Sequence, residues 1–321
     1  FDLFYGKSGE WFNTVELTLQ SIICDMENNG MYVDIQKIAE LDRIWSNKIN
    51  EIESAYELNL RSPKQVMSYL GAVTGNNPRS TDKISLMELS GNVPEANGIL
   101  EHRELSTLVS RYTKPFLSGC TDGFVRGNFN PCGARTGRLS SSNPNLQNIP
   151  ARYTNGRLLR SCFIPPPGLS MVVGDASQIE PRLVAYFTKD RALEDVFLTG
   201  KDFHGEVTKI AFNKSTFTPE ERFIGKTCGL AVLYGAYPER LQGEILKYGG
   251  IRVPLEQVDS IRNRILKYFT SIPRFKDNME RESRYRGYYW TYGGRKVPFV
   301  EKVPIFNHLI QGSQADYIKL C

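Results

Sequence analysis

The sequence lacks the patterns that build thiolate metal sites, disulfide frameworks and membrane spans. Its six cysteines include no C-x-x-C pair, which argues against a zinc ribbon and a disulfide scaffold and fits a reducing, intracellular compartment. No apolar run is long enough to cross a bilayer, and no signal peptide is visible. We therefore expect an intracellular, cytoplasmic protein with no membrane partner, and leave an organelle open as the alternative.

Two common nucleotide-binding motifs are also missing. Gly225-Lys226-Thr227 resembles the end of a P-loop, but Glu220 stands where that motif needs glycine, and no G-x-G-x-x-G occurs. The 321 residues, 40% hydrophobic and 23% charged, suffice for two or three packed globular units. A net charge of +5 permits a polyanionic partner without requiring one.

Helical patterns fill the first third of the chain. We expect a helix over residues 13–30, capped by Asn13, a second after Asp34, a third after Ser62, and a loop over residues 75–86. A fourth, long helix is predicted from apolar residues that share one face, namely Leu105, Leu108, Val109, Tyr112 and Phe116. Beyond it, strand and turn are expected over 123–130.

A polar segment follows at Gly133–Pro150, with the sequence GARTGRLSSSNPNLQNIP. It is too poor in apolar residues to build a core. Its many hydrogen-bond donors suit contact with a sugar–phosphate backbone. The alternative is an ordinary surface loop, which the length of the polar run disfavours.

The stretch around Asp175 is the centre of the predicted site. Met171–Val173 is an apolar run typical of a buried strand, which ends at Gly174. Ser177 is expected to open a helix, with Glu180 in capping-box position. A carboxylate at a strand tip beside a helix start can hold a divalent metal, although a simple turn aspartate would look the same.

A second informative helix is predicted to begin at Thr218, with proline next and glutamate three residues on. Along it, residues four apart form one stripe: Arg222, Lys226, Leu230 and Tyr234. Two cations near the positive end of a helix dipole would bind a phosphate chain, and the aromatic end could pack on a base. A basic solvated edge is the alternative. After it we expect a hairpin over 287–303, then loop turning to helix over 306–320.

Together these segments resemble motifs of family A DNA polymerases. Asp175–Arg182 (DASQIEPR) is similar to motif A, Arg222–Gly235 (RFIGKTCGLAVLYG) to motif B, and Thr136–Pro150 to the primer-template contact segment. Asn307–Asp316 resembles the segment leading toward motif C. The resemblance implies an α+β right-hand polymerase with a helical thumb, an antiparallel-sheet palm and helical fingers. It implies a bacterial or viral source, with an organelle left open.

The resemblance also implies roles for individual residues. Asp175 and Lys226 would be catalytic, and Asp175 with the Ala176 carbonyl would hold two Mg²⁺ ions, with Mn²⁺ as an alternative. Glu180 would be the steric gate against a ribose 2′-hydroxyl. The incoming dNTP would also contact Arg222, Lys226, His204, Gln178, Leu230 and Tyr234. Primer-template DNA would contact Arg138, Asn145, Gln147, Asn148, Asn307 and Gln311. Replisome proteins are further expected partners.

The chain departs from the family pattern in three ways. Leu230 stands where Phe or Tyr is common, and Gly225 and Gly229 should each weaken their helix by roughly 1 kcal/mol relative to Ala, making it more flexible. The motif C carboxylate is expected beyond Cys321, and Asp316 comes too early to replace it. We therefore expect this chain alone to be inactive. The implied division is an upstream exonuclease-like tail (1–12), thumb (13–122), first palm part (123–200), fingers (201–300) and return to the palm (301–321).

Two other functions remain open. One is a primer-template binding module without chemistry, which the missing carboxylate favours. The other is a single-subunit RNA polymerase, which Glu180 disfavours because an RNA polymerase must admit the 2′-hydroxyl.

Overall fold

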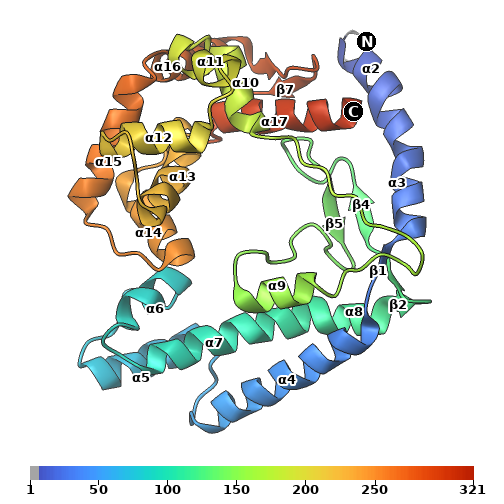
Figure 1. The fold of residues 1–321 in the computed structure, drawn as a ribbon, viewed down its shortest axis with the longest axis vertical. Coiled ribbons are helices and arrows are strands. Elements are labelled where there is room, and N and C mark those ends of the chain that lie inside the picture. Colours follow the sequence, from blue (N-terminus) through green and yellow to red (C-terminus); the bar gives the residue numbers. More distant parts are fainter. Residues whose placement is uncertain (1–6) are drawn as a thin grey trace. The chain divides into compact units, whose positions relative to one another are not determined.

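A computed structural model describes residues 7–321, which form two compact units (Figure 1). One unit, here called the catalytic-motif unit, takes residues 1–22, 131–139 and 174–321; the other, here called the N-terminal helical unit, takes 23–130 and 140–173. Residues 1–6 of the predicted tail lie outside the described residues. The predicted five-part division, with boundaries at residues 12, 122, 200 and 300, stays a prediction.

The first helix is longer than expected. It runs through α2 (Lys7–Trp11), a π-helical turn (Phe12–Glu16) and α3 (Leu17–Asn29), and it ends at Gly30, whose φ is +65°. Asn13 therefore lies inside the helix rather than at a cap, and the capping prediction was wrong.

The predicted amphipathic helices form the core of the N-terminal helical unit. α4 (Ile35–Ser54) begins where Asp34 accepts a hydrogen bond from the Lys37 amide at 3.0 Å. The predicted long helix consists of α7 (Glu95–Leu108), a π-helical turn (Val109–Thr113) and α8 (Lys114–Gly119). Every apolar residue predicted for its inner face is buried, as are Ile38, Leu41, Trp45, Ile49 and Ile52 of α4.

One helix in this unit was missed. α5 (Pro63–Thr74) begins after Ser62 as predicted, but α6 (Lys83–Leu89) occupies part of the expected loop at 75–86. Asp82 caps α6 by accepting from the Ser85 amide at 2.9 Å, and Leu86 is fully buried. The remaining elements are β1 (Met31–Tyr32), β2 (Cys120–Thr121), β3 (Phe124–Val125), β4 (Asn128–Asn130), β5 (Ser140–Ser142) and α9 (Thr154–Arg160).

The described strands form three small antiparallel sheets. The orders are β1-β3-β2, β4-β5, and β6 (Tyr288–Trp290) with β7 (Lys296–Pro298). The last pair is the predicted hairpin, with Tyr289 opposite Val297.

The catalytic-motif unit is built around a core shared by eight helices, in yellow-green to red in Figure 1. The first six are α10 (Ile179–Thr188), α11 (Arg191–Leu198), α12 (Phe203–Phe212), α13 (Pro219–Leu233), α14 (Pro238–Gly249) and α15 (Leu255–Tyr268). The predicted capping box at Thr218 is present at the start of α13. α16 (Ser271–Arg286) and α17 (Ile305–Leu320) follow. α17 is helical from Ile305, because Ile305 and Leu309 pack in a small core with Tyr289, so the expected loop start was wrong.

The strand predicted at Met171–Val173 is absent. These residues are irregular, and Val172 and Val173 are 93% and 83% exposed, since no described strand pairs with them. The helix start also differs, because Gln178 precedes α10 with φ +53° and no side-chain cap. This left-handed turn leaves Ser177 outside the helix, so the capping box predicted for Ser177 and Glu180 was wrong.

Within residues 7–321, no helix combines the length and apolar character needed to cross a membrane.

Candidate functional site

A single carboxylate connects three segments that carry predicted dNTP-binding residues. Asp202 caps α12 by accepting from the Gly205 amide at 2.9 Å. It also accepts from Arg222 Nη1 on α13 at 2.8 Å and from Gln178 Nε2 before α10 at 3.2 Å. Although burial alone would raise it, the pKa of Asp202 is lowered by the Arg222 and Gly205 hydrogen bonds. The loop after Asp175 is thereby fixed to the N-terminal half of α13.

His204 lies next to two of the predicted phosphate-binding cations. Burial lowers the pKa of His204, and the positive charges of Lys226 and Arg222 lower it further, while Asp202 opposes them. His204 Nδ1 is buried and has no hydrogen-bond partner within the described chain. Lys226, one helical turn after Arg222, is exposed. His204, Arg222 and Lys226, to which the resemblance assigns the dNTP phosphates, are thus close enough to interact electrostatically, and their phosphate contacts stay predictions.

The predicted steric gate is held by two side chains. Glu180 Oε1 pairs with Arg138 at 2.5 Å, and Glu180 Oε2 accepts from the Tyr234 hydroxyl at 2.7 Å. Arg138 also donates to Gln314 Oε1. Burial and the bond to Glu180 raise the pKa of Tyr234, so its hydroxyl keeps its proton and remains the donor. Leu230, half-buried, lies one turn before Tyr234.

Asp175 is exposed and makes no hydrogen bond or ion pair with the residues described. Across residues 7–321, no group of three or more His, Cys, Asp or Glu side chains could hold a metal. The Asp175 carboxylate and the neighbouring Ala176 carbonyl are oxygen donors of the kind that Mg²⁺ prefers. They fit a magnesium ion that takes its other ligands from phosphate oxygens and water, not a closed protein cage.

α12 and α13 pack closely because glycine faces the contact. A Cβ added at Gly225 would lie 2.2 Å from Thr208 Oγ1 and 2.8 Å from Thr208 Cα. A Cβ at Gly229 would lie 3.0 Å from Val207 Cγ1. Packing therefore gives both glycines a role that helix propensity alone did not indicate. The greater flexibility predicted for this helix stays a prediction.

α17 carries two predicted DNA-contact residues and one structural aspartate. Asn307 and Gln311 are half-buried, and Asn307 Oδ1 is buried without a partner in the described structure. Asp316 is 1% exposed and pairs with Arg295 Nε at 3.0 Å while accepting from the Gly293 amide at 3.3 Å. The pair gives Asp316 a structural role, and its place outside the catalytic set stays a prediction.

Comparison with known proteins assigns the family. A sequence model of DNA polymerase family A matches residues 35–321. The chain belongs to DNA polymerase family A. Among curated relatives, this family A chain is 33% identical to DNA polymerase I of Synechocystis sp. over 92% of its length. It is 32% identical to the thermostable DNA polymerase I of Thermus aquaticus over 96% of its length.

A solved structure supports the same family assignment. The POL domain of Pol1 from M. smegmatis, in complex with DNA primer-template and dNTP, matches 96% of this chain at 28% identity with a TM-score of 0.80. The chain covers 58% of that structure, 31% of the Synechocystis protein and 40% of the Thermus aquaticus protein. The predicted α+β right-hand polymerase fold is confirmed, as mostly helical structure with small antiparallel sheets.

The remaining predicted DNA contacts of this family A chain lie in the N-terminal helical unit. Asn145 accepts from the amides of Gln147 and Asn148 at 3.1 and 3.0 Å, which fixes the turn at residues 145–148. Gln147 and Asn148 are exposed. Their DNA contacts stay predictions.

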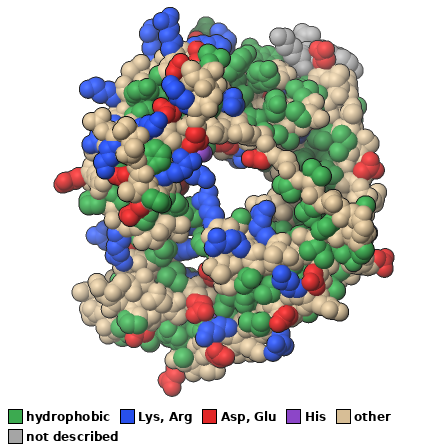
Figure 2. Space-filling view, in the orientation of Figure 1, with side chains coloured by type: hydrophobic (Ala, Val, Ile, Leu, Met, Phe, Trp, Pro, Cys, Tyr) green, Lys and Arg blue, Asp and Glu red, His purple; other side chains and the backbone are tan. Residues whose placement is uncertain are grey.

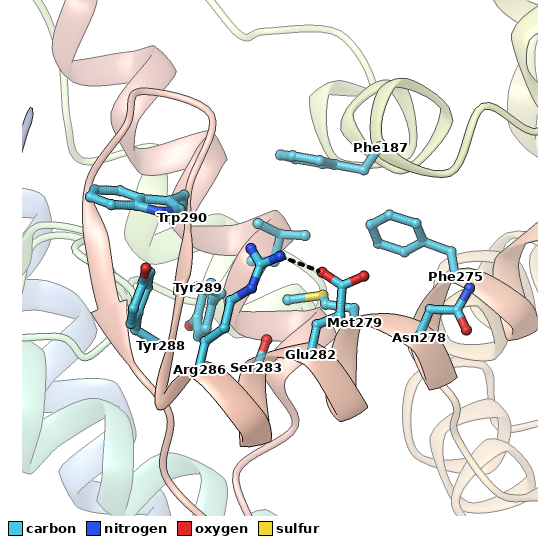
Figure 3. A pocket seen from close by; sticks show the side chains of 11 residues that line it. Phe187, Phe275, Asn278, Met279, Glu282, Ser283, Arg286, Tyr288, Tyr289 and Trp290 are labelled. Carbon is cyan, nitrogen blue, oxygen red and sulfur yellow. Dashed lines mark ion pairs between the residues drawn. The ribbon is translucent and has the colours of Figure 1, made fainter.

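Two hollows of the catalytic-motif unit contain none of the predicted site residues. One, of about 390 Å³, is lined by Phe187, Phe275, Trp290 and others, with Arg286 and Glu282 facing each other at 3.6 Å (Figure 3). The other, about 700 Å³ and open, is lined by Lys209, Lys214, Arg264 and Lys267 between α12 and α15. Figure 2 shows Lys and Arg side chains over that region, on the left. Lys209 and Lys267 lie in the last turns of α12 and α15, where positive side chains interact favourably with the helix dipole. This interaction explains the cations without a ligand.

Proposed function

We propose that this chain is the polymerase region of an enzyme for template-directed DNA synthesis, which transfers a nucleotide from a dNTP to a primer 3′-hydroxyl. The observation that carries the proposal is the convergence of His204, Arg222 and Lys226 beside the loop that follows Asp175. All three side chains can carry positive charge, and His204 Nδ1 is buried without a hydrogen-bond partner in the described structure. Such a group of side chains could bind the phosphates of a triphosphate. The M. smegmatis relative, solved with primer-template and dNTP, supports the same ligands.

Each residue then has a physical task. Arg222 and Lys226 would neutralise phosphate charge, and His204 would donate to a phosphate oxygen from its imidazole. Asp175 and the Ala176 carbonyl would hold Mg²⁺, which when bound activates the primer hydroxyl and stabilises the leaving pyrophosphate. Asp175 is exposed and unpaired, so nothing in the described chain must be displaced before it binds an ion.

Glu180 supports deoxynucleotides over ribonucleotides as substrates. Its carboxylate is fixed by Arg138 and Tyr234, so it cannot easily swing away from a 2′-hydroxyl. We therefore favour a DNA polymerase over an RNA polymerase. Contacts of Asn145, Gln147, Asn148, Asn307 and Gln311 with primer-template DNA belong to the same proposal, as do replisome partners and an intracellular location.

Primer extension by the natural full-length protein tests the function. We expect extension with deoxynucleotides and little with ribonucleotides. Asp175→Ala should abolish extension and leave primer-template binding largely intact, whereas Asp195→Ala, which removes an exposed pair with Lys201, should change neither. Undiminished synthesis by Asp175→Ala would contradict the proposal. The same assay on residues 1–321 tests the expected inactivity of this chain alone.

A further inference from the structure

Asp202 is the one carboxylate, among the described residues, that bonds to Arg222. The Arg222 guanidinium lies 6.0 Å from the centroid of the Phe217 ring and 2.8 Å from Asp202 Oδ2, so it is held on two sides. Both members of the pair are partly exposed, at 45% and 42% of their side chains. The pair is therefore accessible to a competing anion.

Asp202 accepts the hydrogen bonds that Arg222 Nη1 and Gln178 Nε2 could otherwise donate to a phosphate oxygen. A carboxylate and a phosphate present the same acceptor oxygens to a guanidinium. They cannot share its full charge without repelling each other at short distance. Binding of a triphosphate must then weaken the contact between Asp202 and Arg222.

We propose that Asp202 is a positioning residue that holds Arg222 and Gln178 in the unliganded molecule and competes with the triphosphate for Arg222. The inference rests on the proposed function, because it takes the competing ligand to be a nucleotide triphosphate. Asp202 pre-orients Arg222, and its charge lowers the affinity for every anion. Only a ligand with several phosphate oxygens, which also reaches Lys226 and His204, binds in spite of it.

The substitution Asp202→Asn separates this role from capping. Asparagine is as good an N-cap as aspartate and still accepts from the Gly205 amide, so α12 should stay intact. The substitution removes the negative charge and, because an NH2 group replaces the oxygen that faces Gln178 Nε2, also the hydrogen bond from Gln178. Asp195→Asn is the matched control, because Asp195 forms a similarly exposed pair with Lys201 at 3.2 Å on the neighbouring segment.

Calorimetric titration of residues 1–321 with inorganic tripolyphosphate, at low salt and without metal, is the test. We expect Asp202→Asn to bind tripolyphosphate about two- to fivefold more tightly, in line with the strength of an exposed ion pair, and Asp195→Asn to match the wild type. In an NMR titration, His204 in Asp202→Asn should ionise at lower pH than in the wild type, since Asp202 supports its charged form. A purely capping role would leave the affinity for tripolyphosphate unchanged, whereas the His204 shift only confirms that the charge of Asp202 has been removed.

Equal or weaker binding of tripolyphosphate by Asp202→Asn overturns the inference. Primer extension by the full-length protein still decides the proposed function. If the wild type does not bind tripolyphosphate, Arg222 is not a phosphate site, and the inference fails with it. If the full-length enzyme extends primers and Asp202→Asn leaves its KM for dNTP unchanged, the function stands and the role of Asp202 is refuted.

Discussion

The Tyr234 hydroxyl donates to Glu180 Oε2 across 2.7 Å, which joins the C-terminal end of α13 to the first turn of α10. The other Glu180 oxygen is held by Arg138. The carboxylate proposed to exclude a 2′-hydroxyl is therefore fixed from two directions. Its position depends on residues far from it in the chain.

Tyr234→Phe should loosen this carboxylate. A hydrogen bond to a charged group contributes about 1.5–3 kcal/mol, so we expect the preference for deoxy- over ribonucleotides to fall by about tenfold or more. The measurement is the ratio of kcat/KM for the two nucleotide types in the full-length protein. Tyr237→Phe, at a site 72% exposed, is the control and should leave the ratio unchanged. A ratio equally unchanged in Tyr234→Phe would show that the hydrogen bond does not position the gate.

Gly225→Ala should destabilise the catalytic-motif unit despite the better helix propensity of alanine. The new methyl group would meet Thr208 at 2.2 Å and force α12 and α13 apart, at a cost of about 1–3 kcal/mol. Gly229→Ala, with its nearest contact at 3.0 Å, should be close to neutral because the propensity gain of about 1 kcal/mol offsets mild crowding. Urea unfolding of both variants checks the order. Equal stability would contradict the packing argument.

Asp316→Ala should show that this aspartate is structural. Removing it leaves Arg295 partly buried without its ion pair, and losing one partner of a buried pair costs about 3–5 kcal/mol. Glu280→Ala removes an exposed pair with Arg284 and should change the free energy of unfolding by less than about 1 kcal/mol. Chemical denaturation compares the two. A loss of activity without a loss of stability in Asp316→Ala would instead assign it a direct role.

The stability of the fold should depend on pH through His204. Because the folded-state pKa of His204 lies below its unfolded value, the unfolded chain binds more protons between the two. Stability is thus full above the unfolded pKa, near 6.5, and falls as the pH drops through the folded pKa. In His204→Gln the free energy of unfolding should fall less steeply with decreasing pH. The difference in slope should correspond to less than one bound proton. The measurement is the free energy of unfolding of both proteins between pH 5 and 8. Burial also lowers the pKa of His308, so His308 contributes to the pH dependence that remains in the variant. An identical slope in both proteins would exclude His204 as its source.

Helices whose buried face and caps depend only on residues within the segment could be predicted from the sequence. The stripe of α4, with Ile38 and Trp45 buried, and the Thr218 capping box followed from spacing alone. The stripe of α13 was likewise predictable. Its cations are drawn together with His204 because α12 packs on α13.

Features that depend on distant partners were not predictable. Val172 and Val173 have strong strand propensity, but a strand forms only against another strand, and none of those described pairs with them. Asp202 was not among the predicted site residues, and its bonds to Gln178 and Arg222 join residues 20 or more positions apart. No spacing rule connects such residues. The left-handed turn at Gln178 was also not predictable, because positive φ is uncommon for residues other than glycine.

The absence of a side chain at Gly225 has a mechanical consequence. Because Thr208 lies directly against that backbone, α12 and α13 could slide past each other only by breaking this contact, so we expect the pair to move as one body. Glycines with positive φ lie on either side of the pair, at Gly200 before α12 and Gly235 after α13. His204, Arg222 and Lys226 would then travel together, keeping their mutual spacing through any swing toward a substrate.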